Sequence, residues 1–324
     1  MLGERISYQA HSGSLRKGPV TILGGTGFVG RALLERWPRS ERSEICLVVH
    51  RSRPSWIDTC GAAVRTVDDE DRLVEAVSGS EVVINLLRPS GNGWMKAVTA
   101  RIAAQAADVG IRRLLHCSSI DVYGSATAAW IDETTVPQPR TAYEREQLAA
   151  EETAISAPVE TCVVRLGAVF GPGGRNLMAF AQEARSAPLI KLMARRVLYG
   201  VRRLHLVSVE KVADVLRFLA LTEQSFHGER VLVTDDDAPE NNFAFLQDTL
   251  LRMFGRPELG GVPALPDSMM AIGMRLRGRS NSNPKRRFAT TKLPALGFQS
   301  DETFRTRLEK YVEVLGRQDL SVAP

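Results

Sequence analysis

The sequence predicts an α/β fold in which a doubly wound parallel sheet is followed by a smaller, mainly helical C-terminal lobe. Short apolar runs alternate with helix-like segments from Val20 onward, and strands separated by helices are typical of parallel βαβ units. This alternation changes after the glycine-rich residues 171–174, beyond which helical patterns dominate. The expected strands of the sheet cover residues 20–23, 45–49, 63–67, 81–87, 113–117 and 160–165.

Helices are expected where helical spacing is followed by a stop signal. Residues 31–37 precede Pro38, which cannot continue a helix, and the alanine-rich residues 96–109 end at Gly110, a common residue after a helix. The later part of the chain is expected to contain a helix over 177–185, a strand and a helix within 203–221, a strand over 230–233 and a helical, basic remainder.

The composition indicates an ordinary globular protein. Of the 324 residues, 44% are hydrophobic and 24% charged, and the net charge of +5 is compatible with an anionic substrate but does not indicate a nucleic-acid clamp. No apolar run approaches the ~20 residues that span a bilayer, and residues 1–18 contain no signal-peptide core. We therefore expect a cytoplasmic protein. Its widely spaced cysteines predict buried thiols, with neither a metal site nor disulfides: Cys46, Cys60, Cys117 and Cys162.

A glycine-rich loop directly follows the first strand and opens the first helix. Residues 24–30 have the sequence Gly-Gly-Thr-Gly-Phe-Val-Gly, which in this context is the fingerprint of a dinucleotide-binding Rossmann fold. We expect Gly24 to form the tight turn, Gly27 to admit a pyrophosphate to the backbone, and Gly30 to allow close helix–strand packing. The helix N-terminus offers unpaired N–H groups to an anion. The predicted cofactor contacts in this loop are Gly24, Gly27, Phe28, Val29 and Gly30.

The end of the second strand predicts which nicotinamide cofactor binds. NAD-binding folds carry an acid here for the ribose 2′-hydroxyl, but this chain has Arg51 and Arg53 and no carboxylate between Glu44 and Asp58. Because a guanidinium suits a 2′-phosphate, the sequence favours NADP(H), with NAD(H) and solvent-facing arginines as the alternatives. The further candidate contacts of this region are His50, Arg51 and, at the end of the third strand, Asp68 or Asp69 as a contact to the adenine.

The expected domain organisation follows from this cofactor site. Doubly wound sheets bind ligands at the carboxyl ends of their strands, so the C-terminal lobe is predicted to hold the substrate over that edge. The predicted boundaries are a polar arm at 1–18, a Rossmann domain at 19–170 plus 201–235, a substrate-binding lobe at 171–200 plus 236–318, and a tail at 319–324.

Several motifs resemble the extended short-chain dehydrogenase/reductase superfamily, in particular its nucleotide-sugar epimerases, dehydratases and reductases. Besides the glycine loop, they comprise the segment Leu-His-Cys-Ser-Ser-Ile-Asp-Val-Tyr-Gly at 115–124 and Arg-Leu-Gly-Ala-Val-Phe-Gly-Pro at 165–172. The resemblance extends from Val20 to about Phe298, and its remaining motif residues are Glu133, Pro139, Tyr143, Glu151 and the Leu293–Phe298 segment.

The resemblance implies a catalytic role for three residues. Ser119 stands four residues before the Tyr of the Val-Tyr-Gly motif, where family members hydrogen-bond the reacting oxygen, and Tyr143 stands at the position of the proton-transferring tyrosine. Gln147 replaces the lysine that the family places four residues later, so it is expected to hold the nicotinamide ribose without supplying a charge.

The missing lysine bears on the direction of the reaction. Alcohol oxidation needs tyrosine as a phenolate base, whereas ketone reduction needs it as a neutral acid, and an ordinary phenol with a pKa of about 10 is protonated at pH 7. The replacement at Gln147 therefore favours a reductase over an epimerase. Dehydratases of the family carry an acidic pair directly after the catalytic Ser or Thr. Here Ile120 stands in the first of these two positions and only Asp121 is acidic, so dehydration is disfavoured.

The sequence indicates fewer residues for substrate binding than for cofactor binding. By resemblance, Asn176 and Arg203 are candidate contacts to a nucleotide-sugar pyrophosphate, together with Ser119 at the reacting centre. Ala168 and Lys211 depart from the family pattern. Residues 275–287 contain six basic residues and no acid, which fits an anionic partner or a solvated loop, and nucleic acid is not favoured without aromatic residues between the charges.

The sequence thus predicts an NAD(P)-dependent oxidoreductase that uses NADP(H) to reduce a nucleotide-linked keto-sugar. Two alternatives stay open: a sugar-nucleotide epimerase, and a catalytically impaired cofactor-binding protein with a structural or redox-sensing role. The presence of both Ser119 and Tyr143 favours an enzyme. Family members commonly dimerise through two helices that include the Tyr143 helix, which leaves a homodimer as one possible assembly.

Overall fold

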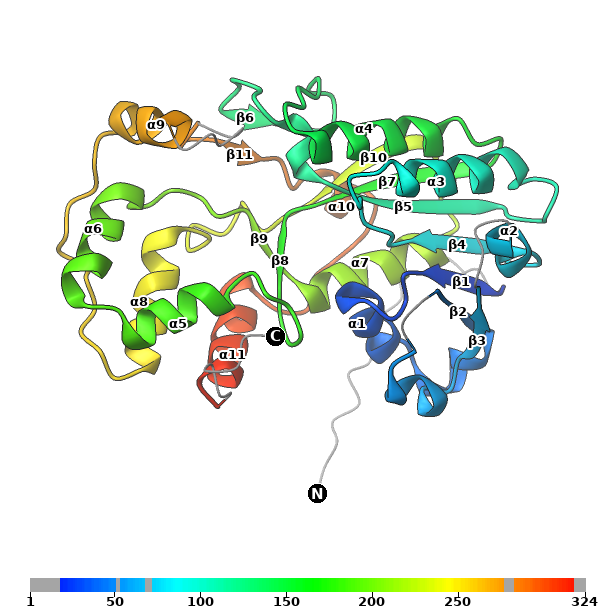
Figure 1. Cartoon of the computed structure of the whole chain (residues 1–324), viewed down its shortest axis with the longest axis horizontal. Helices are drawn as coiled ribbons and strands as arrows, with labels where there is room; N and C mark the ends of the chain where they lie inside the picture. Colours follow the sequence, from blue (N-terminus) through cyan, green and yellow to red (C-terminus); the bar gives the residue numbers. More distant parts are fainter. Residues whose placement is uncertain (1–17, 51–52, 68–71, 277–282, 318–324) are drawn as a thin grey trace.

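The protein is built around a parallel sheet (Figure 1). The computed structural model describes residues 18–50, 53–67, 72–276 and 283–317. Within these ranges, seven strands form a sheet of order β10-β7-β5-β4-β1-β2-β3, and every neighbouring pair is parallel. The predicted doubly wound sheet is therefore confirmed. Its strands are β1 (Val20–Leu23), β2 (Ile45–Val49), β3 (Ala63–Thr66), β4 (Val82–Asn85), β5 (Arg113–Ser119), β7 (Glu160–Leu166) and β10 (His227–Val233).

Helices cover both faces of this sheet because its strands are apolar on both sides. Ile22 belongs to the core beneath α1 and α7, whereas its neighbour Leu23 belongs to the core beneath α2, α3 and α4, as the alternation of side chains along a strand requires. The helices are α1 (Phe28–Arg36), α7 (Val209–Leu221), α2 (Arg72–Val77), α3 (Trp94–Gln105) and α4 (Ala142–Ile155), with short 3₁₀ turns η1 (Arg39–Glu44), η2 (Ser55–Thr59) and η3 (Ile120–Tyr123).

A second group of helices lies at the end of the molecule opposite β3 (Figure 1). Its own apolar core joins Phe170, Leu192, Leu250 and Leu308. The predicted boundaries of the two lobes stay a prediction. The elements here are α5 (Met178–Ser186), α6 (Leu189–Tyr199), α8 (Phe243–Met253), α9 (Asp267–Leu276), α11 (Phe304–Arg317) and the pair β8 (Ala168–Phe170) with β9 (Leu206–Ser208). The short helix α10 (Lys292–Ala295) packs beside β10 on the main sheet, and β6 (Trp130–Ile131) pairs with β11 (Arg287–Phe288).

One strand begins later than the sequence pattern suggests. The apolar residues around 204–207 predict a strand start at Leu204, but β9 begins at Leu206. The reason is the backbone of His205, which has φ 54° and so cannot be extended. Elsewhere the described residues contain no helix long and apolar enough to cross a bilayer. All four cysteines are free and buried, as predicted.

Candidate functional site

The glycine loop lies at the point where the strand order reverses. β1 stands between β4 and β2, so the chain leaves its carboxyl end between crossovers that run in opposite directions, which is where such sheets bind ligands. Gly24 has φ +75°, and the Gly27 N–H donates to its carbonyl at 2.9 Å, which closes the tight turn. Because Gly27 is the N-cap residue of α1 and carries no capping side chain, the first N–H groups of the helix face a possible anion.

Close backbone contacts explain the other glycines of the loop. A Cβ on Gly30 would lie 2.5 Å from Cα and 2.6 Å from the carbonyl oxygen of Gly25, so only glycine lets α1 approach the end of β1. A Cβ on Gly27 would meet only the Gly24 oxygen, at 3.2 Å. The loop therefore offers a bare backbone cradle that fits a pyrophosphate, although these contacts to a cofactor stay a prediction.

A cavity of about 380 Å³ begins at this loop and continues beside α1. Pro172 and Gly173 of the glycine-rich segment 171–174 line it, and Phe28 packs so closely there that a Cβ on Gly174 would lie 2.6 Å from its ring. The residues that line the cavity are Thr26, Gly27, Phe28, Arg31, Ala32, Glu35, Arg36, Trp56, Pro172, Gly173, Val209 and Glu210.

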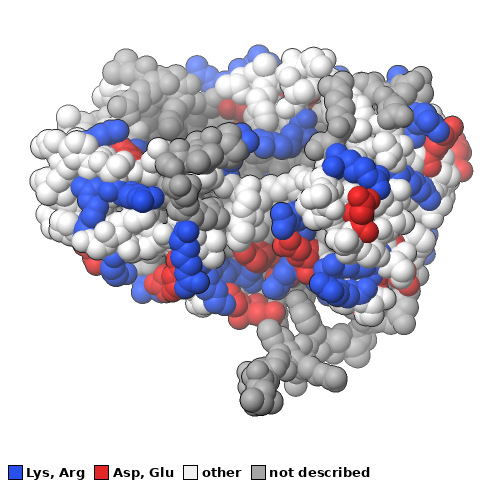
Figure 2. Space-filling model, turned by 60° about the horizontal axis from the view of Figure 1, so that its bottom comes forward, with Lys and Arg blue, Asp and Glu red and all other residues white. Residues whose placement is uncertain are grey.

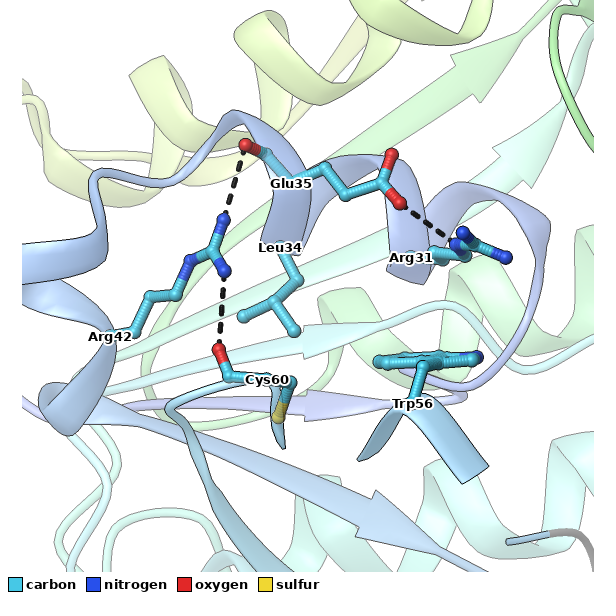
Figure 3. Close-up of a pocket in the computed structure, with 6 residues that line it drawn as sticks. All are labelled: Arg31, Leu34, Glu35, Arg42, Trp56 and Cys60. Atoms are coloured by element: carbon cyan, nitrogen blue, oxygen red, sulfur yellow. Dashed lines mark hydrogen bonds and ion pairs between the residues drawn. The ribbon is translucent and has the colours of Figure 1, made fainter. Parts of the chain in front are cut away.

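A smaller cavity of about 140 Å³ adjoins it between α1 and η2 (Figure 3). Arg31 donates to Glu35 at 2.8 Å and lies 5.7 Å from the centre of the Trp56 ring. Arg42 donates to the Glu35 and Cys60 carbonyls at 3.3 and 3.1 Å. Both arginines are therefore held by the protein itself, and the smaller cavity gives no evidence of a separate ligand.

The end of β2 is only partly described. Arg51 and Asp68, two of the predicted cofactor contacts, lie outside the described residues. His50 stacks on Trp94 with ring centres 5.8 Å apart. Arg53 forms an ion pair with Asp58 at 2.6 Å, but both side chains are about half exposed, so water weakens this pair. A 2′-phosphate could compete for the Arg53 guanidinium.

The catalytic candidates lie at the carboxyl edge of β5 and on α4. Ser119 ends β5 and caps η3, accepting from the Asp121 N–H at 3.1 Å. Tyr143 stands in the first turn of α4, a helix that packs against β5, β7 and η3. Gln147 is buried, and its Nε2 donates to the Tyr143 hydroxyl at 3.1 Å, while no described residue hydrogen-bonds its buried Oε1. Tyr143 and Gln147 thus form a hydrogen-bonded pair.

The neighbours of this pair supply no substitute for the missing lysine from the same helix. Arg145 turns away from Tyr143, as its two-residue spacing predicts, and donates to the Arg140 carbonyl. Glu146 accepts from the Gly91 N–H at 3.2 Å. The start of α4 itself is fixed by a capping box that joins Thr141 to Glu144.

A buried ion pair holds α4 against the sheet. Arg165 on β7 and Glu151 on α4 are both fully buried, with 2.6 Å between Nη2 and Oε2. Ser118 also donates to Glu151, at 2.5 Å, and Arg165 donates to the Tyr123 hydroxyl at 2.7 Å, which in turn donates to the Asp132 carbonyl. These motif residues therefore fix the position of α4, the helix that carries the catalytic candidates Tyr143 and Gln147, and none of them needs to touch a substrate.

The predicted substrate contacts lie at the start of the second lobe. Asn176 is exposed and donates to the Val169 carbonyl at 2.6 Å. Arg203 is half-buried and donates to the Ala238 carbonyl. Its burial, and then the nearby charge of Arg287, lowers its pKa. Both side chains are thus held in place, and their contact with a substrate stays a prediction.

The two departures from the family pattern have separate positions in this lobe. Ala168 begins β8, and Lys211 forms an ion pair with Asp235, two residues after the end of β10. The position that is acidic in the family pattern is therefore a lysine here, and its ammonium group pairs with the acid Asp235. Among the described residues, no cluster of three or more metal-binding side chains occurs.

Sequence reasoning missed a group of ionisable residues beside Ser119. Asp121, His205, Asp236 and Arg286 come from four separate segments and meet at the carboxyl edge of β5, β7 and β10. Arg286 is buried and donates to the Gly124 and Ala126 carbonyls, and its burial lowers its pKa to about 10. The run of three acids at 235–237, shortly after a predicted strand, was the available signal for Asp236. On the face shown in Figure 2, Lys and Arg side chains border a hollow, as suits an anionic ligand.

Solved structures share this architecture. UDP-N-acetylglucosamine 4-epimerase from Bacillus cereus superimposes with a TM-score of 0.66 at 16% identity, covering 95% of this chain and 99% of that one. WbmG from Bordetella bronchiseptica, solved with NAD and UDP, gives a TM-score of 0.68 at 16% identity and 95% of both chains. MoeE5, solved with UDP-glucuronic acid and NAD, gives 0.64 at 20% identity over 91% and 98%.

Sequence comparison identifies the family. No curated protein sequence is significantly similar to the chain. The family model that matches describes the NAD dependent epimerase/dehydratase family and covers residues 20–232, from the start of β1 to Leu232 in β10. The resemblance to the extended short-chain dehydrogenases is thereby confirmed, and the chain belongs to the NAD-dependent epimerase/dehydratase family.

Proposed function

We propose that this protein uses NADP(H) to reduce a keto group on a nucleotide-linked sugar. The observation that carries the proposal is the hydrogen bond from Gln147 Nε2 to the Tyr143 hydroxyl. Because the amide N–H donates to the phenol oxygen, the phenol's own proton is directed elsewhere, toward the substrate position. An uncharged amide also provides no positive charge to stabilise a tyrosinate. The pair therefore suits a neutral acid, which ketone reduction requires.

The chain's residues divide the work as follows. The bare backbone of Gly24, Gly27 and Gly30 would hold the cofactor pyrophosphate at the start of α1. The unpaired Oε1 of Gln147 would accept from a ribose hydroxyl. The bound cofactor supplies the hydride. Ser119 would position the keto oxygen, and Tyr143 would give it a proton.

The choice of NADP(H) rests on the end of β2. No carboxylate stands there to bind a ribose 2′-hydroxyl, and the Arg53 guanidinium is half exposed in a weak ion pair. A nucleotide-linked substrate is supported by family membership and by the half-buried Arg203 near Arg287. Two solved structures of the same fold, MoeE5 and WbmG, contain NAD, so NAD(H) is the alternative cofactor that has to be measured beside NADP(H).

The test is consumption of NADPH, with NADH in parallel, against a panel of nucleotide-linked keto-sugars. Tyr143→Phe should lower turnover about 10²- to 10⁴-fold, the range of general acid catalysis, with little change in cofactor affinity or Tm. Tyr199→Phe, on α6, is the matched control and should keep full activity.

Other outcomes would replace the proposal. Equal interconversion of two nucleotide-sugars without net NADPH consumption would identify an epimerase. Tight NADPH binding with no turnover on any panel member, in wild type and variant alike, would identify a cofactor-binding protein without catalysis.

A further inference from the structure

Arg31 lies between the glycine loop and the turn η2. It lines the cavity of about 380 Å³ together with Gly27 and Trp56, so its side chain and the pyrophosphate cradle face the same space. Arg31 follows Gly27 by four residues, which is ~6 Å along α1. A dinucleotide whose pyrophosphate lies at the start of this helix has its adenosine ribose near the end of β2. The ribose 2′ position is therefore expected on the side of the cavity that Arg31 and Trp56 form.

Two contacts orient the Arg31 guanidinium and leave one edge of it open. Its Nε donates to Glu35 Oε1 at 2.8 Å, and its Cζ lies 5.7 Å from the centre of the Trp56 ring, as Figure 3 shows. No described residue hydrogen-bonds Nη1 or Nη2, and the side chain is 58% exposed. Because a guanidinium that lies over an aromatic ring keeps its N–H edge free, the two terminal nitrogens can bind a ligand in the cavity.

The other arginines that line the two cavities of this region are already occupied. Arg36 donates to both carboxylate oxygens of Asp214, at 2.8 and 2.7 Å. Arg42 donates to three backbone carbonyls. Among the described residues that line these cavities, Arg31 is therefore the arginine whose terminal N–H groups have no protein acceptor.

Arg53 adds a second positive charge beside η2. It follows β2, pairs with Asp58 at 2.6 Å and lies 3.4 Å from the hydroxyl of Thr66 at the end of β3. Trp56 stands three residues later, within η2, and its ring contacts Arg31. Two guanidinium groups, one from α1 and one from the segment after β2, thus lie beside the same short turn. This arrangement suits a dianionic group better than a neutral one.

We propose that Arg31 binds the 2′-phosphate of NADP(H) through Nη1 and Nη2, with Trp56 as the positioning residue of its guanidinium. This inference deepens the proposed function and rests on its preference for NADP(H). A phosphate accepts two parallel hydrogen bonds from a guanidinium, whereas the neutral 2′-hydroxyl of NAD(H) gains little from a cation. Because Nε stays with Glu35, binding breaks no ion pair. Arg31 thereby determines cofactor specificity from α1, outside the segment after β2.

The first test compares two ligands that differ only in the 2′-phosphate. Calorimetry measures the Kd of adenosine 2′,5′-bisphosphate and of 5′-AMP for the full chain, without nicotinamide or sugar. Arg31→Gln should weaken binding of the bisphosphate about 10- to 100-fold, the effect of losing hydrogen bonds to a charged group, and leave the Kd of 5′-AMP unchanged. Arg31→Lys should recover part of the loss, because it restores the charge without the fork of N–H groups.

The second test concerns the positioning role of Trp56. Trp56→Leu keeps the charge of Arg31 but removes the ring that orients its guanidinium, so the affinity for the bisphosphate should fall about 2- to 5-fold. Added salt should weaken bisphosphate binding by wild type and by Trp56→Leu alike, and much less by Arg31→Gln, because a charge that is absent cannot be screened. Wild-type affinity of Trp56→Leu for both ligands would overturn the positioning role.

Arg252→Gln is the matched control for Arg31→Gln. The Arg252 side chain is also 58% exposed and forms a 2.8 Å ion pair with Glu258, near the end of α8. The variant should change the Kd of neither ligand. Thermal unfolding shows whether each variant folds, so that a loss of binding is not read from an unfolded protein.

The contrary outcomes separate this inference from the proposed function. A wild-type protein that binds the bisphosphate no more tightly than 5′-AMP would overturn the NADP(H) preference and the role of Arg31 together. A preference that survives in a folded Arg31→Gln would overturn the role of Arg31 alone and assign the phosphate to the segment after β2. An equal loss for both ligands would show that Arg31 holds the nucleotide without recognising its 2′-phosphate, which also contradicts the inference.

Discussion

The glycine loop and the edge of β5, β7 and β10 lie at the same side of one sheet, yet they are built by different means. The loop depends on backbone proximity: Gly30 and Gly25 approach so closely that no side chain fits between them. The other edge depends on charge: Asp121, His205 and Arg286 meet there from distant segments. A steric constraint within seven consecutive residues can be recognised in a sequence, whereas charged residues that only the fold brings together cannot.

The largest effect is expected where the backbone contact is tightest. In Gly30→Ala the new methyl group would lie 2.5 Å from the Gly25 Cα, and neither backbone can move without displacing the loop. We expect a loss of about 3 kcal/mol in the free energy of unfolding, the upper range for overpacking, with at least tenfold weaker NADPH binding. Urea unfolding and fluorescence titration measure the two effects.

Gly260→Ala is the matched control for this substitution. Its new methyl group would meet no atom within 4 Å, and its backbone has no positive φ. Both measurements should therefore stay near the wild-type values. If Gly30→Ala behaves like Gly260→Ala, close backbone contact does not determine the conformation of the loop. The contrast drawn with the charged edge is then wrong.

The next largest effect is expected from a buried histidine in the middle of the sheet, which belongs to neither of the two compared regions. His116 on β5 is fully buried, and desolvation lowers its pKa to about 4 from 6.5. Because the unfolded chain binds a proton below pH 6.5 and the folded chain does not, stability is greatest above pH 6.5 and falls as the pH drops toward 4. Between pH 7 and pH 5 we expect a loss of about 2 kcal/mol from this residue.

Urea unfolding at both pH values checks the His116 prediction. His116→Gln should show a loss smaller by that amount, whereas His227→Gln, which changes an exposed ring, should lose as much as the wild type. Equal losses in all three proteins would place the acid sensitivity outside the centre of the sheet, for example at the charged edge.

These contrasts explain how much of the site the sequence predicts. The strands of the doubly wound sheet, the turn at Gly24 and the shared helix face of Tyr143 and Gln147 follow from local spacing, and the structure shows each of them. The hydrogen bond between Gln147 and Tyr143 could not be predicted, because spacing alone does not show whether the Gln147 amide contacts Tyr143 or a cofactor. His205 and Asp236 are 31 residues apart and become a pair only because the fold brings the residues after β10 against the start of β9, where the Asp235 N–H donates to the Leu206 carbonyl.

The smallest expected effect tests the direction of the reaction. Gln147→Lys would place an ammonium beside the Tyr143 hydroxyl, 3.1 Å from the present amide nitrogen. A positive charge favours the tyrosinate, which alcohol oxidation needs and ketone reduction does not. We expect about a tenfold gain in the kcat of oxidation, which corresponds to a barrier lower by about 1.4 kcal/mol, and a gain in the kcat of reduction below about threefold. Because the equilibrium constant is unchanged, the KM values change so that the ratio of kcat/KM in the two directions stays the same. Steady-state rates in both directions, on the keto-sugar and its alcohol, provide the measurement.

Gln182→Lys on α5 introduces the same charge at an exposed position and should change neither rate. Equal gains in both directions for Gln147→Lys would mean that the lysine acts by holding the cofactor and not by charge. The hydrogen bond between Gln147 and Tyr143 would then say nothing about direction, and the case for a reductase over an epimerase would depend on the substrate panel alone.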